Sequence, residues 1–169
     1  MTTTLIFSAP LLAERIAFLC EEKGIDKEIA ALDFGMIKLK LQEPDEGEDW
    51  TADQCESAEL EYKRYLHLCK IFGPGIVPNR IMDIFWHYHI LDTRAYHSNC
   101  DLVFGGYLHH YPYFGMRGEQ DSLDLQEAFF VTKQRYLETF REEMSREDQE
   151  MKCWHDCQNR CWHACSNGK

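Results

Sequence analysis

The sequence predicts an all-α fold, a single-domain helical bundle with a few short extended segments and a cysteine-rich C-terminal helix. Apolar residues recur at helical spacing in several segments, which begin and end with capping or breaking residues. Alternating runs joined by short glycine turns, which would indicate β-hairpins, are missing. The 169 residues suffice for one core, so we assign 1–151 to a helical domain with a central Trp-His-x-His cluster and 152–169 to a Cys/His-rich tail.

The first helix is expected over residues 8–24. Ser8 provides the N-cap, Pro10 lies close to the start, and Gly24 ends the run. A second, weaker helix is expected over 27–41, and a solvated acidic loop follows it.

A third helix should open at Thr51, because Thr51 and Gln54 have the spacing of a capping box. It runs to the Phe-Gly-Pro-Gly sequence at 72–75, which cannot continue a helix. A final long amphipathic helix is expected over about 122–151, with the charged stretch 141–150 in water. Its inward positions are Leu125, Ala128, Phe129, Thr132, Tyr136 and Phe140.

Between these helices, Asn79 is placed to cap a helix that starts at Arg80. In that helix Asp83 and His87 share one face with Arg94, while His89 points elsewhere. The alternative is a strand over 84–91, which residue propensity favours and which would turn His87 and His89 to the same side. A lone strand has no evident partner, so the helix is preferred.

Five of the eight histidines lie between Pro78 and Gly115. We interpret this histidine cluster as a candidate site for a transition metal, Zn, Fe or Cu. Asp83 stands one helical turn before His87 and can orient its imidazole or bind the metal itself. The alternative is a rigid polar core in which each histidine is simply hydrogen-bonded. The candidate ligands are His87, His89, His109, His110, Asp83 and Cys100.

The tail carries a short repeat in which two Cys-Trp-His-x-Cys units place four cysteines at every fourth position. A helix would align the four sulfurs along one stripe, which favours a second, soft-metal site. Two alternatives remain open, disulfides within the tail or to Cys20, Cys55, Cys69 and Cys100, and a packing helix. The cysteines are Cys153, Cys157, Cys161 and Cys165.

The net charge of −11 and the absence of a Lys/Arg cluster argue against nucleic acids and anionic membranes as partners. The first ten residues lack the charged and apolar regions of a signal peptide, so we expect the protein in the cytoplasm with reduced thiols. Expected partners are a small-molecule or peptide substrate, or a protein docked through the tail.

The segment from Met82 to Thr93, with its Asp-x-x-Trp-His-x-His element, resembles the glycine-rich domain-containing protein-like family. The resemblance continues through Tyr96, Cys100 and the stretch 109–118, and the tail resembles that of compact bacterial members. It implies a fold expectation and no catalytic residue. We therefore expect a cytoplasmic metal-binding protein, and more specifically an enzyme that depends on Fe, Cu or Zn. The alternatives are a Cu(I) or Zn buffering or delivery protein that uses the tail, and a non-enzymatic interaction module.

Overall fold

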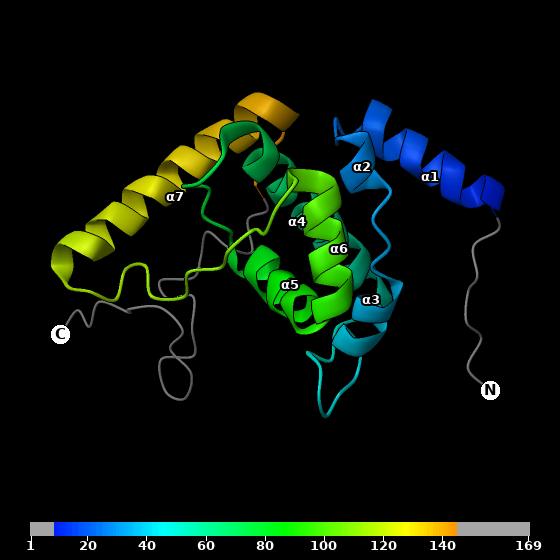
Figure 1. Ribbon diagram of the computed structural model, residues 1–169, viewed down its shortest axis with the longest axis horizontal. Helices are drawn as coiled ribbons and strands as arrows, with labels where there is room; N and C mark the ends of the chain where they lie inside the picture. Colours follow the sequence, from blue (N-terminus) through cyan, green and yellow to red (C-terminus); the bar gives the residue numbers. More distant parts are fainter. Residues whose placement is uncertain (1–8, 145–169) are drawn as a thin grey trace.

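The computed structural model describes residues 9–144, and within this range the chain forms seven α-helices and no strand. This confirms the predicted all-α class, whereas the predicted cysteine-rich helix lies outside the described residues. None of the described helices has the length and apolar character needed to cross a membrane. The helices, shown in Figure 1, are α1 Ala9–Glu21, α2 Lys27–Ala30, α3 Gly35–Leu41, α4 Ala52–Phe72, α5 Arg80–Leu91, α6 Thr93–Phe104 and α7 Glu119–Phe140.

Helix α4 is the centre of the bundle and contacts α2, α3, α5 and α7. Figure 1 shows α1 to α3 on one side of it and α7 leaning away on the other. The predicted capping box is present, because Thr51 Oγ1 accepts from Gln54 N at 3.2 Å and Gln54 Oε1 accepts from Thr51 N at 2.8 Å. These two bonds satisfy amide groups that a helix leaves without internal partners and so fix the start of α4.

Aromatic side chains fill the space between α3, α4 and α5. The rings of Tyr62 and Phe85 stack with centroids 5.1 Å apart. The ring of Phe34 is tilted against that of Tyr62, with centroids 5.6 Å apart, and packs edge-on against that of Phe85 at 5.4 Å. Tyr65 contacts Trp86 at 5.1 Å. All five residues are buried, and these ring contacts hold α5 against α4.

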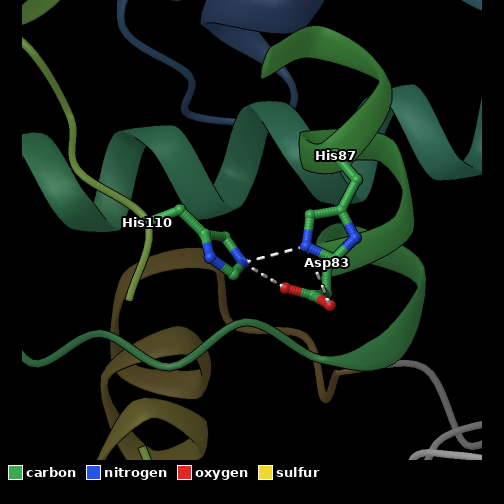
Figure 2. Close-up of side chains that lie close together, drawn as sticks. All are labelled: Asp83, His87 and His110. Atoms are coloured by element: carbon green, nitrogen blue, oxygen red, sulfur yellow. Dashed lines mark hydrogen bonds and ion pairs between the residues drawn. The ribbon is translucent and has the colours of Figure 1, made fainter. Parts of the chain in front are cut away.

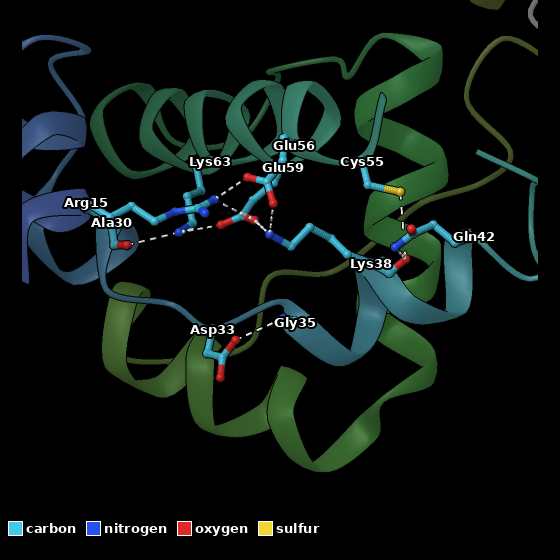
Figure 3. Close-up of polar contacts among 10 residues, drawn as sticks. All are labelled: Arg15, Ala30, Asp33, Gly35, Lys38, Gln42, Cys55, Glu56, Glu59 and Lys63. Carbon is cyan, nitrogen blue, oxygen red and sulfur yellow. Dashed lines mark hydrogen bonds and ion pairs between the residues drawn. The ribbon is translucent and has the colours of Figure 1, made fainter. Parts of the chain in front are cut away.

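A buried carboxylate joins α1, α3 and α4 (Figure 3). Glu59 is only 4% exposed and lies within 3.0 Å of three cationic groups, on Arg15, Lys38 and Lys63. Lys63 also donates to the carbonyl of Ala30 at 2.9 Å. Burial raises the pKa of Glu59, but Lys63 and Lys38 outweigh burial and the pKa lies below its ordinary value.

The predicted helices over 27–41 and 122–151 have clearly different bounds in the structure. The segment 27–41 is two helices, because the chain leaves the helix after α2 and so brings the buried Phe34 into the core. The side chain of Asp33 then accepts from Gly35 N at 2.9 Å at the start of α3. Helix α7 begins three residues earlier than predicted and ends at Phe140, where Arg141 adopts a left-handed conformation with φ of 57°.

Candidate metal centre

The first helix of the candidate site, α5, begins where the sequence predicts. Asn79 Oδ1 accepts from Met82 N at 2.9 Å and thereby caps the helix. Asp83 and His87 then lie one turn apart on the same face, as predicted for a helix and not for a strand. Arg94 is separated from them, since the chain breaks at Asp92 and the side chain of Asp92 caps the new helix α6.

Asp83, His87 and His110 come together at this face of α5 (Figure 2). His110 Nε2 lies 3.0 Å from Asp83 Oδ1 and 3.1 Å from His87 Nε2. His87 Nε2 lies 3.8 Å from Asp83 Oδ2. Figure 2 shows the two α5 side chains projecting toward the imidazole of His110, which enters from a separate segment. One oxygen and two ring nitrogens thus face a common point, and we refer to these three residues as the triad.

The triad is buried on one side and open on the other. The side chains of Asp83 and His110 are 9% and 12% exposed, whereas that of His87 is 32% exposed. Of the three side chains, that of His87 is the most accessible to solvent. A half-open set of three ligands is typical of catalytic metal sites, while structural sites close all positions with protein ligands.

The segment that carries His110 is tied to α5 and α6 by a short hydrogen-bonded chain. Trp86 Nε1 donates to the Tyr96 hydroxyl at 2.9 Å, and that hydroxyl donates to the carbonyl of Leu108. The ring of Trp86 also packs on His110, with centroids 4.5 Å apart. Helix α6 ends at Gly105 in a left-handed conformation, with φ of 67°, which turns the chain toward α5. These contacts fix the position of the His110 imidazole relative to Asp83 and His87.

His89 lies elsewhere, in the core. Its Nδ1 is 2.9 Å from the Tyr62 hydroxyl and its Nε2 is 2.9 Å from Nδ2 of Asn99. Both ring nitrogens therefore have protein partners. Burial lowers the pKa of His89 to about 4, which keeps the ring neutral. This residue fits the polar-core alternative that the sequence left open.

The structure does not bring the remaining predicted ligands to the triad. His109 is exposed and its ring contacts Tyr107 at 5.2 Å. Cys100 is buried in the core at 2% exposure. Cys20, Cys55, Cys69 and Cys100 are free thiols, so no disulfide forms among the described residues. The tail cysteines Cys153, Cys157, Cys161 and Cys165 lie outside the described residues, and their ligand role stays a prediction.

Comparison with known proteins assigns the chain to a family. The family model described as UCP032817-like matches residues 34–150, which include all three members of the triad. The chain belongs to the UCP032817-like family. No curated protein and no solved structure matches the chain. The family has no assigned function, so function has to be argued from the site.

The predicted membership of the glycine-rich domain-containing protein-like family is therefore wrong. The segment from Met82 to Thr93 that carried the resemblance lies inside the region matched by the UCP032817-like family. The structure gives a physical reason why such a segment misleads. Trp86 and His89 are buried core residues of α5, so packing alone accounts for two of the three specified residues of the Trp-His-x-His element.

Sequence reasoning selected all three triad residues but could not separate them from the other candidates. The spacing of Asp83 and His87 places this pair on one face, because four residues make about one helical turn. The choice of His110 over its neighbour His109 depends on the contacts of Trp86 and Tyr96, which no local pattern reveals.

Proposed function

We propose that this protein binds a transition-metal ion through Asp83, His87 and His110, with open positions for water or substrate, and acts as a metal-dependent enzyme. The observation that carries the proposal is the convergence of one carboxylate oxygen and two Nε2 atoms within 4.8 Å of one another on a half-open surface. Two histidines and one carboxylate form the ligand set of many non-haem Fe(II) oxygenases and of His₂Glu zinc hydrolases.

The distances support a shared ion. Ligands bound at about 2.1 Å lie about 3.0 Å apart around an octahedral ion and about 3.4 Å apart around a tetrahedral one. The contacts of His110 Nε2, at 3.0 and 3.1 Å, match the octahedral spacing. The distance of 3.8 Å between His87 Nε2 and Asp83 Oδ2 exceeds both spacings, so binding of a shared ion requires a side-chain rotation of Asp83 or His87.

Without an ion, the three side chains of the triad are linked through one ring N–H group. A carboxylate oxygen only accepts, so the proton between His110 and Asp83 sits on Nε2 of His110 and also faces Nε2 of His87. A metal ion would take the place of this proton, because ligating imidazole nitrogens must be unprotonated. The carboxylate would then balance part of the charge of the cation.

The donor atoms also narrow the choice of metal. Cu(I) favours thiolate and thioether sulfur, and the triad contains neither. Fe(II) and Zn both accept an N₂O donor set, Fe(II) for oxidation chemistry and Zn for activation of a water molecule. We therefore favour Fe(II) or Zn at the triad.

The decisive experiment measures metal in full-length protein purified anaerobically without chelator, by elemental mass spectrometry. His87→Ala and His110→Ala should each lower the metal content by about one ion per chain, because two ligands hold a divalent ion poorly. His109→Ala is the matched control, since His109 neighbours His110 but is exposed and outside the triad. Circular dichroism should show unchanged helix content in all three variants.

Cobalt substitution adds an independent measurement. Co(II) at the triad should give ligand-field bands without a thiolate charge-transfer band, and His110→Ala should remove them. Equal metal loss in His109→Ala and His110→Ala would contradict the site, and so would unchanged metal content in both His87→Ala and His110→Ala. If the wild-type protein is purified without metal and also fails to bind added Zn or Fe(II), a non-enzymatic interaction module is favoured instead.

A second function, buffering or delivery of Cu(I) or Zn, is supported by the four cysteines of the tail. It predicts several soft-metal ions per chain and no turnover. Because thiolates and the triad differ in donor type, the two functions give different cobalt spectra and can be told apart in one sample.

A further inference from the structure

A cavity of about 710 Å³ lies between α4, α5 and the residues that follow α7. This volume is typical of pockets for small organic ligands. The triad residues do not line it, although Arg80 and Ile84 of its wall flank Asp83 on α5. The cavity is therefore a separate site from the candidate metal centre.

The lining of this cavity is acidic. Two arginines line it together with five carboxylates, those of Glu48, Asp53, Glu61, Glu142 and Glu143. One arginine, Arg64, is already engaged by the protein, with Nη2 at 2.7 Å from Glu142 and Nη1 at 2.6 Å from the Tyr136 hydroxyl. Arg64 thus forms an ion pair with Glu142, although its Nε has no hydrogen-bond partner among the described residues. The four other carboxylates of the lining outnumber Arg80, so the potential of the cavity favours a cation.

One buried acid of the wall has an unused oxygen. Glu61 is 9% exposed, and its Oε1 accepts from Tyr136 at 2.7 Å. Its Oε2 has no hydrogen-bond partner in the described structure, which is costly for a buried polar atom. The same cavity is also lined by apolar residues, Trp50, Leu60, Ile81 and Ile84. Aromatic and acidic groups together recognise organic cations.

We propose that this cavity binds a small organic amine, with the ammonium group among the carboxylates and an apolar body against Trp50 and the isoleucines. Glu61 is the most buried acid of the lining, and its Oε2, which has no hydrogen-bond partner, is the atom that we expect the ammonium group to approach. The proposal does not depend on the metal centre.

The test compares two probes of the same shape and opposite charge, 4-phenylbutylamine and 4-phenylbutyrate, by titration calorimetry on the full-length protein. The amine should bind saturably and at least about tenfold more tightly than the acid, and added salt should weaken it. Asp53→Asn combined with Glu143→Gln should weaken amine binding by about tenfold. The matched control removes two exposed acids of α7, with Glu127→Gln and Glu138→Gln, and should leave binding unchanged.

Two further variants locate the amine. Ser57→Trp fills the cavity from its exposed wall and should abolish binding, whereas His110→Ala should leave binding intact. Equal or tighter binding of the acid would overturn the proposal, as would the absence of saturable amine binding. Full amine binding in folded Ser57→Trp protein would place the amine elsewhere and also overturn it. Loss of metal from His110→Ala with unchanged amine binding would support both sites separately.

Discussion

At the scale of single residues, His89 shows what a histidine does when both ring nitrogens are occupied. The amide nitrogen of Asn99 can only donate, so Nε2 of His89 accepts and Nδ1 carries the proton that is donated to Tyr62. Protonation of the ring would place two donors against each other and charge a buried group. The core therefore holds His89 in one tautomer and in the neutral state.

This state predicts a dependence of stability on pH. The folded pKa of His89 is about 4 and the unfolded value is about 6.5, so the unfolded chain binds more protons between these pH values. The free energy of unfolding should fall as pH decreases from about 6.5 to about 4, by about 3 kcal/mol from this residue. Urea unfolding of the wild type and His89→Gln at pH 7, 6 and 5 measures it. The free energy of unfolding should depend less steeply on pH in the variant, because the variant lacks His89 and keeps every other titrating group. Equal pH dependence in the two proteins would contradict the assignment.

At the scale of elements, the buried ion pairs of Glu59 connect α1, α3 and α4. Glu59→Gln should destabilise the fold by about 3–5 kcal/mol, because it leaves Lys63 charged and buried without its carboxylate. Glu56→Gln is the matched control: Glu56 also pairs with Arg15 and Lys38, but its side chain is 48% exposed. Glu56→Gln should lower the free energy of unfolding by less than about 1 kcal/mol. Similar urea midpoints for the two variants would show that burial does not set the strength of this cluster.

The hydroxyl group of Tyr96 is one of the contacts that position the loop before α7. Tyr96→Phe removes the bonds to Trp86 and to the carbonyl of Leu108 while keeping the ring in the core. We expect about a tenfold or greater loss in affinity for Zn with a smaller effect on unfolding, because changes to the groups that support a metal ligand have effects of this size. Competition with a chromophoric chelator measures the affinity. A variant that unfolds more easily but binds Zn as tightly as the wild type would assign Tyr96 to packing alone.

The helices also show which features of the fold can be predicted from the sequence. Thr51 and Asn79 predict where their helices begin, because an N-cap is a local signal within four residues. The breaks at Asp33 and Asp92 were missed, although an aspartate that caps a following amide is a visible signal at both positions. The pairs of Glu59 with Arg15 and Lys38 and the approach of His110 to α5 join residues 21 or more positions apart, and the periodicity of the sequence does not predict such pairs.

At the scale of the whole molecule, two kinds of candidate metal-binding side chain are separated along the sequence. The triad offers nitrogen and oxygen, and the residues beyond Met151 offer four thiols and two imidazoles. Truncation after Met151 should remove the soft-metal fraction and leave about one Fe or Zn ion per chain, because the triad and its supporting contacts lie within residues 83–110.

Elemental analysis of the truncated and full-length proteins, each with a free-thiol count, measures this separation. In cobalt-substituted protein, the thiolate charge-transfer band should vanish on truncation while the ligand-field bands of the triad persist. Loss of both signals would mean that the tail supplies a ligand to the triad, which has open positions for one. Undiminished metal content would instead assign the tail cysteines to disulfide bonding or to the docking of a partner.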